Sequence, residues 1–122
     1  MPTGANLLPG LATCTNCPLH ENGFVVPGNG PIHAAVMVIG EAPGEYENAL
    51  GKPFVGQSGR LLTELLASAG FDRDDLYLTN VVKHWPGPRN PTPTAAQIKA
   101  CLPWLTMEIE QVDPAVIITV GA

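Results

Sequence analysis

Apolar positions form three short continuous runs with helically spaced apolar residues between them. The runs cover residues 34–39, 76–82 and 115–120, and such runs are typical of strands buried in a parallel sheet. The first helical pattern consists of Leu61, Leu62, Leu65 and Leu66. The second consists of Ile98, Leu102, Leu105 and Ile109. The order strand, helix, strand, helix, strand predicts two successive crossover units and an α/β fold, a three-layer α/β/α sandwich with a central parallel sheet.

Residues that commonly begin and end helices flank both helical patterns. Ser58 is a suitable N-cap for the first helix and Gly70 a suitable stop, while Thr94 can cap the second. Pro103 lies inside the second pattern, so we expect a kink or a break near Cys101.

We expect one domain over residues 1–122. Residues 1–33 are rich in glycine and proline and follow no helical or strand period, so something other than regular pairing must order them, and a metal site would do so. This irregular, cluster-binding segment precedes an α/β core over residues 34–122. The sequence stops directly after an apolar strand, where open α/β sheets hold their active crevice. We therefore expect an incomplete domain whose sheet is truncated after the third strand.

Composition limits the partners that the protein can have. Six basic and eleven acidic residues give a net charge of −5, which argues against non-specific coating of duplex DNA but leaves room for a local basic cluster. No apolar run approaches the roughly 18 residues of a membrane span, and no secretory signal is visible. We expect a soluble, cytoplasmic monomer that does not bind membranes.

Four residues are candidate ligands for a soft metal. Cys14 and Cys17 form a C-x-x-C pair, whose turn points two thiolates at one metal, and His84 and Cys101 could complete a tetrahedral set. Zinc and an iron–sulfur cluster both fit this pattern. The alternative is that the thiols are unremarkable, with Cys101 an ordinary buried helix residue and His84 a surface imidazole.

An acidic loop follows the first strand. In the segment Gly40-Glu-Ala-Pro-Gly-Glu45, a carboxylate at the strand end can activate water or stabilise a developing cation. A tight acidic turn with no chemical role is the alternative.

Several linked motifs together resemble one enzyme family. They are Cys14-x-x-Cys17, Gly40-Glu-Ala-Pro-Gly-Glu45, Gly51-Lys-Pro-Phe-Val-Gly56, Ser58-Gly-Arg-Leu-Leu62, Leu78-Thr-Asn-Val-Val-Lys83 and Cys101-Leu-Pro-Trp-Leu105. In this order and spacing they closely resemble the iron–sulfur uracil-DNA glycosylases, family 4 of that superfamily. The resemblance implies excision of uracil from single- or double-stranded DNA by hydrolysis of the N-glycosidic bond, and a 4Fe–4S cluster.

The resemblance also implies a role for each site residue. Glu41 would position water or stabilise the oxocarbenium-like transition state, and Asn80 would read uracil through its amide. Phe54 would stack on the extruded base. Ala42 would offer a backbone N–H near the base, and Glu47 would form a wall of the pocket near C5.

Contacts to DNA phosphates are expected beside this pocket. The segment containing Gln57, Ser58 and Gly59 opens a helix and could hold a phosphate on its backbone amides, although capping explains Ser58 equally well. The basic residues of the expected rim are Lys52, Arg60, Lys83 and Arg89. A solvated face is the alternative for these cations.

The chain departs from the family pattern at three points. His84 stands where the third cluster ligand is usually cysteine, so we expect a Cys3His cluster. Ala42 stands where the DNA-cross-linking branch has glutamine, so we expect hydrolysis instead of cross-linking. A His-Pro-Ser-like motif, which stabilises the uracil anion, does not occur in the sequence, so we expect weak or no activity. The alternatives are a non-catalytic nucleic-acid-binding module and a zinc-stapled nucleotide-binding module.

Overall fold

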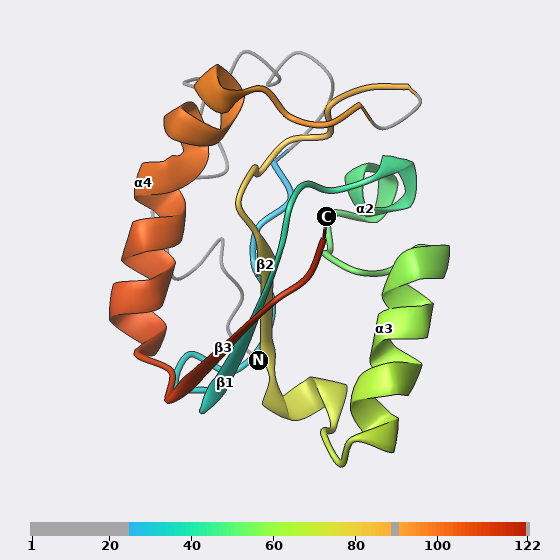
Figure 1. The fold of residues 1–122 in the computed structure, drawn as a ribbon, viewed down its shortest axis with the longest axis vertical. Coiled ribbons are helices and arrows are strands. Elements are labelled where there is room, and N and C mark those ends of the chain that lie inside the picture. The colour runs from blue at the N-terminus through green and yellow to red at the C-terminus, as the bar shows by residue number, and fades with distance from the viewer. Residues whose placement is uncertain (1–24, 89–90, 122) are drawn as a thin grey trace.

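The structure, a computed structural model, describes residues 25–88 and 91–121. Its sheet has three parallel strands in the order β2-β1-β3. The strands are β1 (Val36–Gly40), β2 (Tyr77–Asn80) and β3 (Val116–Thr119). Helix α3 (Gln57–Ser68) covers one face of the sheet and α4 (Ala95–Val112) covers the other (Figure 1). The predicted three-layer α/β/α fold with a central parallel sheet is therefore confirmed.

Two short elements lie between the main ones. They are the helix α2 (Glu45–Leu50) and the single 3-10 turn η3 (Arg73–Asp75). The sequence predicts a loop after the first strand, and this prediction is wrong from Glu45 onward, where α2 begins. A helix of six residues is too short for its apolar spacing to stand out.

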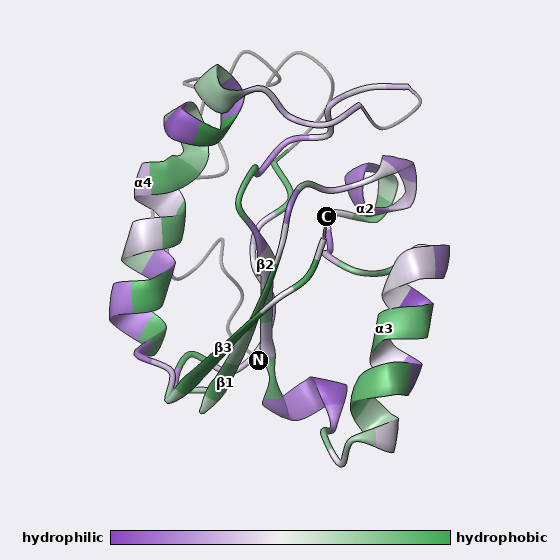
Figure 2. Ribbon diagram, viewed as in Figure 1, coloured by the Kyte–Doolittle hydropathy of each residue, from purple (hydrophilic) through white to green (hydrophobic). Residues whose placement is uncertain are grey.

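The central strand β1 carries the core on both faces. Met37 and Ile39 belong to the apolar cluster that includes Leu105 of α4, while Val38 belongs to the cluster that includes Leu66 of α3. Figure 2 shows the apolar strands β1 and β3 between helices whose surfaces carry both apolar and polar residues. Burial on alternate faces explains why β1 reads as one continuous apolar run.

The described end of the irregular N-terminal segment pairs with the sheet. Asn29 and Leu78 exchange both backbone hydrogen bonds, each at 2.8 Å, in an antiparallel bridge. Val26 N also donates to Lys83 O at 2.7 Å. The expectation that residues 1–33 lack regular pairing is therefore wrong for Val26 and Asn29. The glycines and prolines around them break any strand period in the sequence, so this pairing could not be recognised there.

The helix ends test the predicted caps. Thr94 caps α4, since its hydroxyl accepts from Gln97 N at 3.2 Å and Gln97 Oε1 accepts from Thr94 N at 2.9 Å. Ser58 is not a cap, because α3 begins one residue earlier and its N-cap is Gly56. Gly70 follows the end of α3 with a φ of 93°, as a C-terminal stop should.

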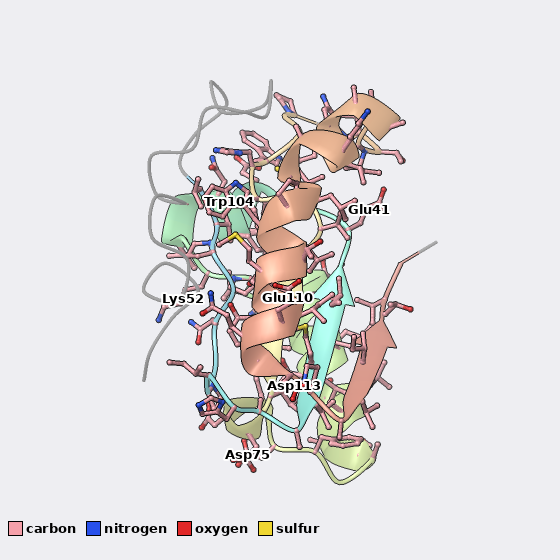
Figure 3. All side chains as sticks on the ribbon, turned by 90° about the vertical axis from the view of Figure 1, so that its left-hand side faces the viewer. Glu41, Lys52, Asp75, Trp104, Glu110 and Asp113 are labelled. Atoms are coloured by element: carbon pink, nitrogen blue, oxygen red, sulfur yellow. The ribbon has the colours of Figure 1, made fainter. Side chains whose placement is uncertain are left out.

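Proline does not interrupt α4. The helix contains Pro103 and is continuous over all 18 residues, so the predicted break is wrong. Its first turns lie off the axis of the remainder, which agrees with a kink (Figure 3). Over the part of the chain that the structure describes, no helix has both the length and the apolar character needed to cross a membrane.

Candidate active site

The carboxyl ends of β1 and β2 lie side by side at one edge of the sheet. Gly40, the last residue of β1, pairs in register with Asn80, the last residue of β2. The next residue, Val81, donates its N–H to Gly40 O at 2.9 Å. Glu41, the next residue after β1, therefore lies next to the end of β2. Figure 3 shows Glu41 near the opposite end of the molecule from Asp113, which lies just before β3. This edge is where an open α/β sheet presents its ligand crevice.

Two side chains converge on the bare backbone of Gly40. A Cβ atom at this position would lie 2.5 Å from Asn80 Oδ1 and 2.7 Å from Phe54 Cζ. The amide of Asn80 and the ring of Phe54 are thus neighbours, and glycine leaves the space that both occupy.

The same groups line one cavity of about 280 Å³. Among the residues around it are Glu41, Ala42, Glu47, Phe54, Ser58, Gly59 and Asn80. Part of the proline-rich segment after β2 lines its other side, including Pro86 and Pro91. The structure therefore brings a carboxylate, an amide and an aromatic ring to a single cavity.

A sequence model of the Uracil DNA glycosylase superfamily matches residues 27–122. The chain belongs to the uracil DNA glycosylase superfamily.

Curated relatives are similar over most of this chain. A type-4 uracil-DNA glycosylase of Thermotoga maritima is 48% identical over 89% of the chain, and one of Pyrobaculum aerophilum is 46% identical over 91%. One of Archaeoglobus fulgidus is 43% identical over 91%. The chain spans 56–57% of the length of these relatives.

Glu47 ties the loop that carries Phe54 to the start of α2. Its carboxylate accepts hydrogen bonds from Gly44 N and Val55 N, each at 2.9 Å, and from Gly56 N at 2.5 Å. Glu47 lines the cavity of this superfamily member, which is compatible with the pocket wall expected of it. The three backbone contacts are a second role that no sequence pattern indicated.

The start of α3 contributes Ser58 and Gly59 to the cavity, whereas Gln57 is exposed beside it. A Cβ atom at Gly59 would overlap the backbone of Phe54, lying 2.5 Å from its Cα. Close packing of α3 against the Phe54 loop therefore requires glycine here, whether or not the helix start binds phosphate.

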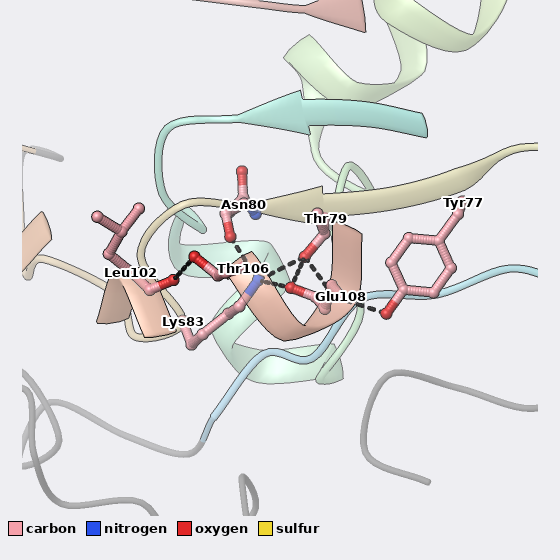
Figure 4. Close-up of polar contacts among 7 residues, drawn as sticks. All are labelled: Tyr77, Thr79, Asn80, Lys83, Leu102, Thr106 and Glu108. Atoms are coloured by element: carbon pink, nitrogen blue, oxygen red, sulfur yellow. Dashed lines mark hydrogen bonds and ion pairs between the residues drawn. The ribbon is translucent and has the colours of Figure 1, made fainter. Parts of the chain in front are cut away.

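Lys83 does not belong to a DNA-facing rim. Its side chain is completely buried and forms an ion pair with Glu108, which is buried to the same degree. It also donates to Thr79 Oγ1 at 2.6 Å and to Asn80 O at 2.5 Å (Figure 4). The prediction of a phosphate contact is wrong for this residue. Of the other predicted rim cations, Lys52 and Arg60 are exposed and Arg89 lies outside the described residues.

Glu108 is the centre of this buried network. Tyr77 Oη donates to Glu108 Oε2 at 2.6 Å, and Thr79 Oγ1 lies 2.9 Å from the same oxygen. Burial, followed by the negative charge of Glu108, raises the pKa of Tyr77 far above its usual range. Burial lowers the pKa of Lys83, and the charge of Glu108 opposes this shift.

The sequence contains a signal for Glu108 that the analysis missed. The buried residues of α4 are Cys101, Leu105, Glu108 and Val112, which follow the spacing of one helix face. An acid on that face must find a buried partner, because an unpaired internal charge is very costly.

The predicted metal ligands are only partly described. Cys14 and Cys17 lie outside the described residues. His84 and Cys101 are both buried, with exposed fractions of 2% and 0%, so the alternative of a surface imidazole is wrong. Cys101 packs with Val82, close to His84 in the chain. Within residues 25–88 and 91–121, no three His, Cys, Asp or Glu side chains gather as a metal site.

Proposed function

We propose that this protein excises uracil from DNA by hydrolysing the N-glycosidic bond of a base turned out of its strand. The observation that carries the proposal is the convergence of Glu41, Phe54 and Asn80 on one cavity at the carboxyl edge of the sheet. Membership of the superfamily and the names of the type-4 relatives support the same reaction.

Asn80 and Phe54 would recognise the base. The amide of Asn80 offers an acceptor for uracil N3–H and a donor for O4, whereas cytosine presents the opposite pair. The ring of Phe54 would stack on the plane of the base, and Ala42 would offer its backbone N–H nearby. The base must leave the duplex stack because the glycosidic carbon is not accessible there.

Glu41 would act at the sugar. A carboxylate at the strand end can position the attacking water and stabilise the positive charge that develops on the sugar as the bond breaks. The other groups would hold the substrate, with Glu47 as a wall of the pocket. The backbone at Gln57, Ser58 and Gly59 would bind a DNA phosphate at the start of α3.

We propose further that Cys14, Cys17, His84 and Cys101 hold a 4Fe–4S cluster. The burial of His84 and Cys101 fits this role, because cluster ligands are removed from bulk water. A bound cluster would supply a redox-active crosslink between distant segments. Visible absorption and iron content of the purified chain would distinguish it from a zinc site, since zinc is colourless.

Isosteric substitutions test the proposed reaction. Asn80→Asp keeps the size of the side chain but removes the donor to uracil O4, and Glu41→Gln removes the negative charge at the sugar. Glu45→Gln is the matched control, since Glu45 is an exposed acid of the same segment.

The measurements are release of uracil from an oligonucleotide with one deoxyuridine, and preference in binding this oligonucleotide over its deoxycytidine counterpart. We expect Asn80→Asp to abolish the preference and each site variant to slow release about 100-fold or more, with Glu45→Gln unchanged. A wild-type chain with neither release nor preference would contradict the proposal and favour a non-catalytic binding module.

A further inference from the structure

Phe54 has a backbone conformation that its side chain disfavours. Its φ is 55°, in the left-handed region, which is unusual for a bulky residue. Such a conformation persists only where the surrounding structure enforces it. The residue proposed to stack on the base is therefore held in place by neighbouring groups.

Arg73 supplies three of these holding contacts from η3. Its Nη2 donates to Pro53 O at 2.7 Å, and its Nη1 donates to Phe54 O at 2.5 Å and to Thr63 Oγ1 at 2.8 Å. Thr63 in turn donates to Gly59 O at 2.9 Å. The guanidinium group thus joins the Phe54 loop to helix α3.

The chemistry of these contacts suits arginine in particular. Arg73 is half-buried, so its charge-assisted hydrogen bonds are partly shielded from water. The planar fork of a guanidinium can reach two adjacent carbonyl oxygens at once, which a lysine ammonium cannot reproduce. Glu47 accepts from the N–H groups of Val55 and Gly56, so a basic side chain holds the carbonyl acceptors of the loop and an acidic side chain holds its N–H donors.

We propose that Arg73 is a positioning residue for the ring of Phe54, fixing the loop backbone so that the ring lies beside Asn80 in the cavity. The proposal rests on the proposed function for the identity of the base that the ring meets. Arg73 itself does not line the cavity, so it can affect the substrate only through the groups that it holds, among which the Phe54 loop carries the ring.

Two variants test the contact in the full chain. Arg73→Met removes all three donors and Arg73→Lys keeps only a point charge. Lys99→Met, on the exposed side of α4, is the control for the loss of charge. The measurements are affinity for a single-stranded oligonucleotide containing deoxyuridine, affinity for the same strand with an abasic site, and hydrogen exchange of the Val55 and Gly56 amides.

We expect Arg73→Met to weaken deoxyuridine binding about tenfold and to speed exchange of both amides by a similar factor. Arg73→Lys should fall between Arg73→Met and the wild type. Abasic DNA offers no base to stack on, so its affinity should not change. A purely structural role would instead weaken both affinities together.

A double-mutant cycle with Phe54→Ala makes the test decisive. If Arg73 acts through the ring, Arg73→Met should have no further effect on deoxyuridine binding when Phe54 is already alanine. Additive effects, unchanged amide exchange, or failure of both Arg73 variants to fold would overturn the proposal. If the wild-type chain shows no preference for deoxyuridine, the proposed function fails, while amide exchange still tests the contact.

Discussion

At the scale of single residues, Glu108 shows how a buried acid organises its neighbours. Its carboxylate forms an ion pair with Lys83 and hydrogen bonds with the hydroxyl groups of Tyr77 and Thr79. All three partners come from β2 or the segment after it. Lys83 also binds the carbonyl of Asn80, so the network lies directly behind the residue proposed to read the base. Pairing makes such burial tolerable, and loss of one partner is therefore costly.

Glu108→Gln tests this pairing. Glutamine keeps an acceptor for Tyr77 but leaves the ammonium of Lys83 buried without its counter-charge. We expect the free energy of unfolding to fall by about 3 to 5 kcal/mol, measured by chemical denaturation. Glu110→Gln, at an exposed position of the same helix, should change it little. Equal effects of the two variants would contradict the role of the ion pair.

Tyr77 should make stability depend on pH above 10. Its pKa in the folded protein is raised above the ordinary value of 10.0, so the unfolded chain releases this proton first and stability falls as pH rises. The loss is up to about 1.4 kcal/mol per pH unit for one group.

The stability advantage of the wild type over Tyr77→Phe should therefore shrink between about pH 9 and about pH 11. Tyr46→Phe is the control, because the side chain of Tyr46 is 65% exposed. The measurement is the free energy of unfolding of both proteins, from chemical denaturation at each pH. If the difference between the wild type and Tyr77→Phe stays constant with pH, the buried hydroxyl does not titrate on unfolding.

At the scale of elements, the strands and the two long helices follow from the apolar pattern. Leu66 and Leu105 lie in the core as their spacing predicts. Leu61 and Leu65 of the first pattern and Leu102 of the second are exposed instead, so the spacing located the helices but overstated the width of their buried faces. The cap predicted at Ser58 is wrong, since the N-cap is Gly56, and Gly59 in the first turn of α3 packs closely against the backbone of Phe54.

Gly59→Ala tests that packing. Alanine favours a helix by about 1 kcal/mol over glycine, but its Cβ would overlap the backbone of Phe54. We expect a net loss of about 2 kcal/mol in the free energy of unfolding and weaker binding of deoxyuridine, measured by denaturation and by titration. Ser68→Ala, at the exposed end of α3, should leave both nearly unchanged. A stabilised Gly59→Ala variant would show that the loop can move aside at little cost.

At the scale of the whole molecule, the proposed cluster would connect segments that are distant in the sequence. Its described ligands are His84, after β2, and Cys101, in α4. Because the cluster would bind the folded chain and not the unfolded one, its binding would stabilise the fold.

We expect iron removal, or His84→Ala, to lower the free energy of unfolding by several kcal/mol and to remove the visible absorption. His33→Ala is the matched control, because His33 is exposed. The measurements are iron content, absorption and thermal denaturation of the same samples. A His84→Ala chain with full iron content would contradict ligation by this residue.

The apolar pattern along the chain is enough to predict the layers of the fold, and parallel strands bring their carboxyl ends to one edge, which places Glu41 beside the end of the strand that carries Asn80. The burial of Lys83, the contacts of Arg73 with the Phe54 loop, and the close packing that requires glycine at positions 40 and 59 came only from the folded structure. Those features depend on distances between side chains far apart in the sequence. Local patterns report the faces of single elements and carry no information about such distances.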